Sequence, residues 1–128
     1  MIYIDSSVAL AHVLVEPRAP PESFWEASLV SSRLLEYELW NRAYAYGIAG
    51  SHADEIEMLL LRVDLIEMTR EVLARALEPF PVSIRTLDAL HLATAEFLRT
   101  QGRYVEVASY DNRLIAAAEA LGITLAAV

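Results

Sequence analysis

Residues 1–8 read Met-Ile-Tyr-Ile-Asp-Ser-Ser-Val, and this stretch decides the fold. The first four residues are apolar, as in a short buried strand, and Asp5 closes the run. Ser6 or Ser7 can then cap a helix that carries Val8 and extends to about residue 16. A strand that passes directly into a helix is typical of α/β folds, in which helices connect parallel strands.

The same alternation of strand and helix patterns continues along the chain. Further strands are predicted at 29–31, 64–68, 105–109 and 123–128. Helices are predicted at 22–27, from 32 to about 47 or 50, from 51 onward, and at 69–77, 86–100 and 111–121. This order predicts a three-layer α/β/α fold with a mainly parallel central sheet of about five short strands.

Polar residues and glycines mark the expected helix ends. Ser32, Thr69, Thr86 and Asp111 each precede a helical pattern, so we expect them to act as N-caps. Gly122 follows the last helical pattern, where a glycine commonly ends a helix.

Length and composition exclude several classes of protein. The 128 residues suit a single domain, 1–128, and 55% apolar residues supply a core. No apolar run approaches the roughly 20 residues that span a bilayer. The first residues lack the basic segment of a secretory signal, and there is no cysteine for disulfides or thiolate chemistry. We therefore expect a cytoplasmic protein without membrane association.

Charge restricts the chemistry further. The chain has 18 acidic and 10 basic residues, for a net charge of −8, and it contains no lysine. Lysine nucleophiles, Schiff bases and P-loop lysines are therefore excluded. Non-specific binding to phosphates through a basic surface is also disfavoured, so an RNA or DNA substrate would need local arginines or metal ions.

Acidic residues gather where a parallel sheet places its ligands. Asp5 directly follows the first predicted strand, Asp111 follows the 105–109 strand, and Asp88 lies in the first turn of the 86–100 helix. Since ligands bind beyond the carboxyl ends of parallel strands, these three can share one edge. Glu38 lies beside the apolar stripe of its helix. Four such carboxylates repel one another unless divalent cations lie between them, and oxygen ligands favour Mg²⁺ or Mn²⁺.

Each acid also has a purely structural interpretation. Asp5 and Asp111 can be helix N-caps, and the helix dipole favours Asp88 in a first turn. Glu38 can pair with Arg42 one helical turn later. These interpretations do not predict that the acids should lie together.

Four segments resemble the motifs of PIN domains over essentially the whole chain: IYIDSSVAL at 2–10, SSRLLEYEL at 31–39, RTLDALHLATA at 85–95 and SYDNRL at 109–114. In the second segment, the pairs Ser31-Ser32 and Glu38-Leu39 match the family's motif, and this match implies that the family's acid is Glu38. Glu36 projects to the opposite side of the helix, as an ordinary solvated acid does.

The chain most closely resembles the VapC-type toxins of bacterial and archaeal toxin–antitoxin pairs. This resemblance implies an endoribonuclease dependent on Mg²⁺, with Mn²⁺ as a substitute, that is usually a homodimer. It also implies a small antitoxin whose C-terminal segment lies across the active-site groove. Asp5 and Asp88 would hold the metal most directly, with Glu38 and Asp111 completing its shell. The proline-rich segment 17–25 and the lack of lysine depart from the family, and they bear on RNA binding rather than on the metal site.

Further residues near the acids have two interpretations each. Ser6 and Ser109 can orient a ligand water or phosphate, or can serve as cap or turn residues. Arg85 and Arg113 can contact RNA phosphates, or can form surface ion pairs. His91 can take part in acid–base chemistry, although its apolar neighbours favour a packing role.

Aromatic residues at helical spacing, Tyr37, Trp40 and Tyr44, favour packing in the core. The region is too rich in apolar faces for one small monomer, so we expect part of it to be exposed and to serve the homodimer or the antitoxin.

Two further functions remain open: a PIN-fold nuclease of RNA processing or DNA repair, and a non-catalytic PIN-like binding module. A receiver-like phospho-acceptor domain is excluded, because it requires a lysine.

Overall fold

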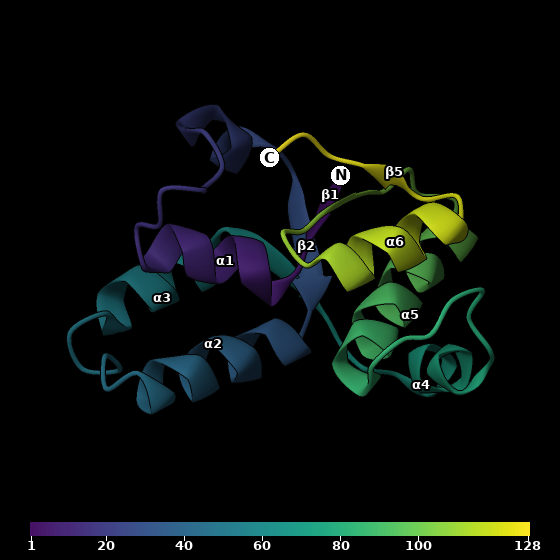
Figure 1. Cartoon of the computed structure of the whole chain (residues 1–128), viewed down its shortest axis with the longest axis horizontal. Helices are drawn as coiled ribbons and strands as arrows, with labels where there is room; N and C mark the ends of the chain where they lie inside the picture. The colour runs from purple at the N-terminus through teal and green to yellow at the C-terminus, as the bar shows by residue number, and fades with distance from the viewer.

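A five-stranded sheet runs through the middle of the computed structural model, which describes all 128 residues (Figure 1). The strand order is β3-β2-β1-β4-β5, and every neighbouring pair is parallel. The predicted parallel sheet is thus confirmed. The strands are β1 (Ile2–Ile4), β2 (Leu29–Ser32), β3 (Val63–Ile66), β4 (Glu106–Ala108) and β5 (Thr124–Leu125).

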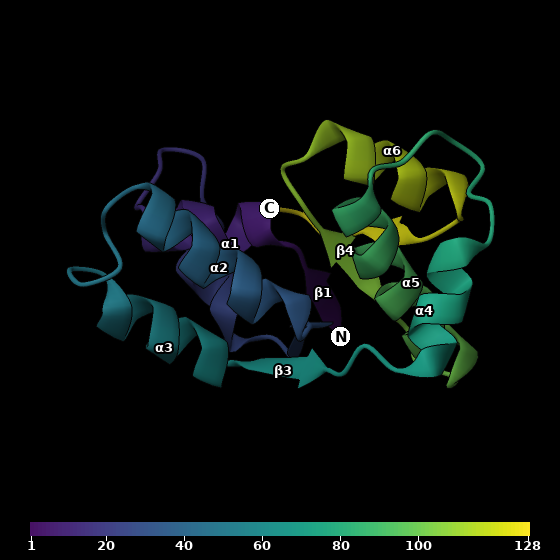
Figure 2. The same cartoon turned by 90° about the horizontal axis from the view of Figure 1, so that it is seen from below.

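Six α-helices form the two outer layers, which confirms the three-layer architecture. Figure 2 shows α1, α2 and α3 on one side of the strands and α4, α5 and α6 on the other. The helices are α1 (Ser6–Val13), α2 (Leu34–Ala45), α3 (Ala53–Leu61), α4 (Arg70–Leu77), α5 (Thr86–Thr100) and α6 (Asn112–Ala120), with a short 3-10 helix at Glu22–Glu26. None of them has the length and hydrophobicity needed to cross a membrane.

Alternating side chains of β1 divide the core in two. Ile4 belongs to a cluster with Val8 of α1 and Leu35 of α2 on one face of the sheet. Tyr3 points the other way and packs with Leu92 of α5 and other apolar residues on the opposite face. Because successive strand residues face opposite sides, the central strand is covered on both faces.

Strand order fixes where a ligand can bind. The chain moves outward from β1 through β2 to β3, and then returns to the other side of β1 as β4. Such a reversal opens a crevice between β1 and β4 beyond their carboxyl ends. The segments that follow these two strands carry Asp5 and Asp111.

Several predicted helix ends differ from the structure. Helix α1 ends at Val13, short of residue 16, because Val15 adopts a left-handed conformation (φ 52°) and the Glu16 amide donates back to the Ala11 carbonyl. Helix α3 begins at Ala53, two residues after the predicted start. The cap at Thr86 is wrong, because Thr86 is the first residue of α5.

Two other predicted caps are confirmed. Thr69 caps α4 by accepting the Val72 amide, and Asp111 caps α6 by accepting the Arg113 amide. The cap at Ser32 is wrong, because Arg33 takes the N-cap position of α2, although the Ser32 hydroxyl still accepts the Leu34 amide. The last strand is shorter than the predicted 123–128, because β5 pairs only with Glu106 and Val107 of the short edge strand β4.

Candidate active site

All four acidic residues that the sequence analysis singled out line one cavity of about 600 Å³ beyond the carboxyl ends of β1 and β4. They come from four separate places in the sequence: Asp5 follows β1, Glu38 lies in α2, Asp88 lies in the first turn of α5, and Asp111 precedes α6. The fold therefore brings them together, which their individual structural roles do not require.

Asp5 is buried and fully engaged by hydrogen bonds. Its Oδ1 accepts the Ser7 amide (3.1 Å), the Val8 amide (3.4 Å) and the Ser7 hydroxyl (2.6 Å). Its Oδ2 accepts the hydroxyl of Ser109 at 2.7 Å. Burial raises the pKa of Asp5, while the hydrogen bonds from Ser7 and Ser109 oppose that rise. Asp5 is thus the N-cap of α1 as well as a wall of the cavity.

Ser7 and Ser109 join the segments that follow β1 and β4. The Ser7 hydroxyl accepts the backbone amide of Tyr110 at 2.8 Å, and the Ser109 hydroxyl accepts that of Asp111 at 2.9 Å. Ser109 is buried behind Asp5, whereas Ser7 lines the cavity. The sequence analysis named Ser6 or Ser7 only as the possible cap of this helix, and that is wrong, because Asp5 is the N-cap and both serines lie in the first turn of α1. A hydroxyl two residues after a capping aspartate was a usable signal for the role of Ser7 beside the acids.

Glu38 is held by two side chains from other helices. Its Oε2 accepts the hydroxyl of Ser6 at 2.9 Å, and its Oε1 lies 2.5 Å from Nε2 of His91. The alternative pairing of Glu38 with Arg42 does not occur. Glu36 instead pairs at the surface with Arg33.

Asp88 has the fewest hydrogen-bond partners of the four acids. It is buried, and its Oδ2 has no hydrogen-bond partner. Burial, and then the charges of Asp111 and Asp5, raise the pKa of Asp88, against the opposing influence of His91 and Arg85. A buried carboxylate oxygen that faces other carboxylates and lacks a donor favours a cation as its partner.

Comparison with known proteins decides the family. The family model described as PIN domain matches residues 2–126. The chain belongs to the PIN domain family. Two relatives from Mycobacterium tuberculosis are named Ribonuclease VapC35, 30% identical over 132 residues, and Ribonuclease VapC46, 32% identical over 130 residues. The matches cover 99% and 98% of this chain, and 96% of each relative.

A solved structure shares the fold of this PIN domain. It is titled as a toxin-antitoxin complex from Klebsiella pneumoniae, and it superposes with a TM-score of 0.62 over 94% of both chains, at 16% identity. At that identity the likeness concerns the fold alone.

The donor set of this PIN domain fits a hard divalent cation. All four acids offer carboxylate oxygens, which suit Mg²⁺ or Mn²⁺, and Asp88 supplies an oxygen that no protein donor satisfies. As the side chains stand, no three acidic or histidine residues are grouped closely enough to share an ion. Binding an ion therefore requires some of the carboxylates to turn toward it.

Arginines flank the acids unevenly. Arg85 lines the cavity at the start of α5, and Arg42 lines it from α2, together with the exposed Tyr37 and Tyr46. Arg113 is exposed and is not among the residues that line the cavity. Its backbone amide donates to Asp111, but its guanidinium forms no ion pair with the acids.

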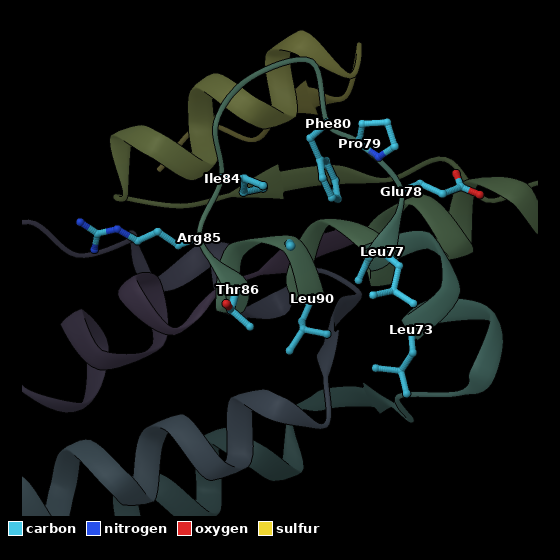
Figure 3. Close-up of a pocket in the computed structure, with 11 residues that line it drawn as sticks. Leu73, Leu77, Glu78, Pro79, Phe80, Ile84, Arg85, Thr86 and Leu90 are labelled. Atoms are coloured by element: carbon cyan, nitrogen blue, oxygen red, sulfur yellow. The ribbon is translucent and has the colours of Figure 1, made fainter.

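A second, more apolar cavity of about 530 Å³ adjoins the first. It lies between the end of α4, the segment 79–85 and the first turns of α5 (Figure 3). Phe80, Ile84 and Leu77 contribute apolar side chains, and Arg85 and Thr86 line both cavities. This PIN domain thus has an acidic cavity beside a more apolar one.

Proposed function

We propose that this PIN domain is a metal-dependent endoribonuclease that hydrolyses phosphodiester bonds of RNA, and that it is the toxin of a toxin–antitoxin pair in the cytoplasm. The observation that carries the proposal is the convergence of four acids on one cavity, together with the unpartnered oxygen of one of them, Asp88. The ribonuclease names of relatives that match almost the whole chain support the same activity.

Asp5 and Asp88 would hold the ion most directly, and Glu38 and Asp111 would complete its surroundings. A bound Mg²⁺ or Mn²⁺ supplies a water of lowered pKa and offsets the charge of the scissile phosphate. The chain's own contribution is orientation, because Asp5 is fixed by two backbone amides and two serine hydroxyls before any ligand arrives.

Arg85 and Arg42 are the cations that line the acidic cavity, so they are the residues proposed to contact RNA phosphates there. Ser6 acts differently, because it donates to Glu38 and thereby keeps that carboxylate at the cavity wall. The excess of acids over arginines in the cavity makes RNA binding dependent on the cation.

An antitoxin is the proposed protein partner, and a homodimer is the proposed oligomeric state. An acidic cavity beside an apolar one suits a segment with both basic and apolar side chains. Exposed aromatic residues of α2, Tyr37 and Tyr44, and the exposed Leu61 of α3 offer further apolar contact surface.

Cleavage of RNA tests the activity. Purified protein is incubated with 5′-labelled total RNA in the presence of Mg²⁺, Mn²⁺ or EDTA, beside the variants Asp88→Asn and Asp64→Asn. Asp64 is an exposed residue of β3 and serves as the matched control. We expect cleavage with either metal, none in EDTA, a loss of at least about 100-fold in Asp88→Asn, and no change in Asp64→Asn.

Three results would contradict the proposal. Cleavage that persists undiminished in EDTA and in Asp88→Asn would exclude the acidic cavity as its source. RNA bound without cleavage under every metal condition would favour a non-catalytic binding module, and cleavage of DNA but not RNA would favour a repair nuclease.

A further inference from the structure

A line of hydrogen bonds, buried at its inner end and part-buried at its outer end, leads from the central strand to the acidic cavity. The hydroxyl of Tyr3 in β1 lies 2.7 Å from Nδ1 of His91 in α5, and Nε2 of the same imidazole lies 2.5 Å from Oε1 of Glu38 in α2. Ser6 of α1 donates to the other oxygen of Glu38. The line therefore connects the central strand with helices from both outer layers.

The chemistry of each group assigns the hydrogens along this line. An ionised Glu38 can only accept, so His91 must carry a hydrogen on Nε2. Nδ1 of a neutral imidazole is then an acceptor, and the hydroxyl of Tyr3 can donate to it. The Tyr3 oxygen in turn accepts the backbone amide of Ser32 at 3.1 Å. With this tautomer every polar atom of His91 is satisfied without a charge on the ring.

Glu38 depends on this imidazole more than Asp5 depends on any single partner. Asp5 is held by two backbone amides in addition to its serines. The hydrogen bonds of Glu38 come only from the side chains of Ser6 and His91, and His91 is 2% exposed. Removal of the imidazole would therefore free one carboxylate oxygen and allow the Glu38 side chain to rotate.

We propose that His91 is a positioning residue: its Nε2–H holds the Glu38 carboxylate at the wall of the acidic cavity, and Tyr3 fixes the tautomer that makes this possible. The inference rests on the proposed function, because it assigns Glu38 to the surroundings of a divalent cation. Groups that orient a metal-binding side chain typically change metal affinity by about 10- to 100-fold when removed.

The first experiment measures Mn²⁺ binding to the RNA-free protein by isothermal titration, in wild type, His91→Leu, His91→Gln and Tyr3→Phe. Glutamine can place an amide N–H near the position of Nε2, whereas leucine fills the space without a donor. We expect His91→Leu to weaken Mn²⁺ binding about 10-fold or more, His91→Gln to recover most of the loss, and Tyr3→Phe to fall between. Equal affinities in His91→Leu and wild type, or equal losses in the leucine and glutamine variants, would overturn the proposal.

RNA cleavage gives a second readout that packing alone would not produce. A positioning role predicts that kcat falls in His91→Leu more than KM rises, with rescue by glutamine. A loss confined to KM would contradict it.

A third measurement separates this inference from the proposed function. Two-bond ¹H–¹⁵N correlation spectra of the metal-free protein report which ring nitrogen of His91 carries hydrogen. Hydrogen on Nε2 is expected, and a bare Nε2 would overturn the inference whatever the protein does with metal or RNA. If wild type binds no Mn²⁺ while Nε2 carries hydrogen, the metal-dependent function fails and the role of His91 toward a metal ligand fails with it. Binding that is weakened most in His91→Leu, with most of the loss recovered in His91→Gln and Tyr3→Phe in between, supports both.

Discussion

Asp88→Asn should stabilise the metal-free protein, although it alters a residue of the proposed active site. The substitution removes a charge from a buried oxygen that has no donor and that faces Asp5 and Asp111. Leaving a buried polar group unsatisfied costs about 1–3 kcal/mol, and more for a charged group. Because asparagine keeps a polar group at this position, the substitution removes only the additional cost of the charge and its repulsion by Asp111 and Asp5. The substitution also removes a stabilising interaction, because a negative charge in the first turn of α5 interacts favourably with the helix dipole by about 0.3–1 kcal/mol. The cost of the buried charge is larger than this helix-dipole interaction, so we expect the free energy of unfolding to rise by about 1 kcal/mol.

Urea unfolding in EDTA at neutral pH measures this gain directly, and thermal unfolding should show a midpoint about 3–5 °C higher for a chain of this size. Asp64→Asn, which changes an exposed carboxylate in β3, is the matched control and should stay within about 0.5 kcal/mol of wild type. A loss of about 1 kcal/mol or more in Asp88→Asn would refute the reasoning, because it would mean that the helix terminus stabilises this carboxylate more than burial and its acidic neighbours destabilise it.

Three further predictions concern stability. Ser7→Ala removes the hydroxyl that donates to Asp5 and accepts a backbone amide after β4, so urea unfolding should show a loss of about 1–2 kcal/mol. The pKa of Asp88 is raised by burial and by neighbouring charges, so the folded state binds that proton more tightly than the unfolded state. The stability of metal-free wild type should therefore rise relative to Asp88→Asn as the pH falls through the raised pKa, and a pH series of unfolding curves in which the difference stays constant would contradict this. Thr69→Ala should cost about 1 kcal/mol because Thr69 caps α4, whereas Thr86→Ala should change thermal stability by less than about 0.5 kcal/mol because Thr86 caps nothing.

The sequence predicts the positions of the acids well, because each follows from a local rule. Asp5 and Asp111 begin helices directly after strands of a parallel sheet, and the strand pattern shows that these strands point the same way. The 3.6-residue period separates Glu38, which lies beside the apolar stripe of α2, from the solvated Glu36.

What the sequence does not show is how side chains from distant segments meet. Local pattern gives His91 a packing role, and burial agrees with it, but the hydrogen bonds to Glu38 and Tyr3 connect residues 53 and 88 positions apart. No periodicity within one helix reports a contact of that range. The sequence also leaves the exact ends of helices open by a residue or two. Threonine is a good N-cap and was predicted at Thr86, but the N-cap of α5 is Arg85, one residue earlier.

Crystals of the protein grown or soaked with Mn²⁺ test the central claim most directly, because anomalous scattering locates the ion. We expect an ion in the acidic cavity bound at about 2.1 Å by oxygens of Asp5 and Asp88, with Glu38 and Asp111 turned toward it or bridged through water. An acidic cavity without bound Mn²⁺ at millimolar concentration, with the four carboxylates oriented as in the metal-free structure, would contradict a metal-dependent nuclease.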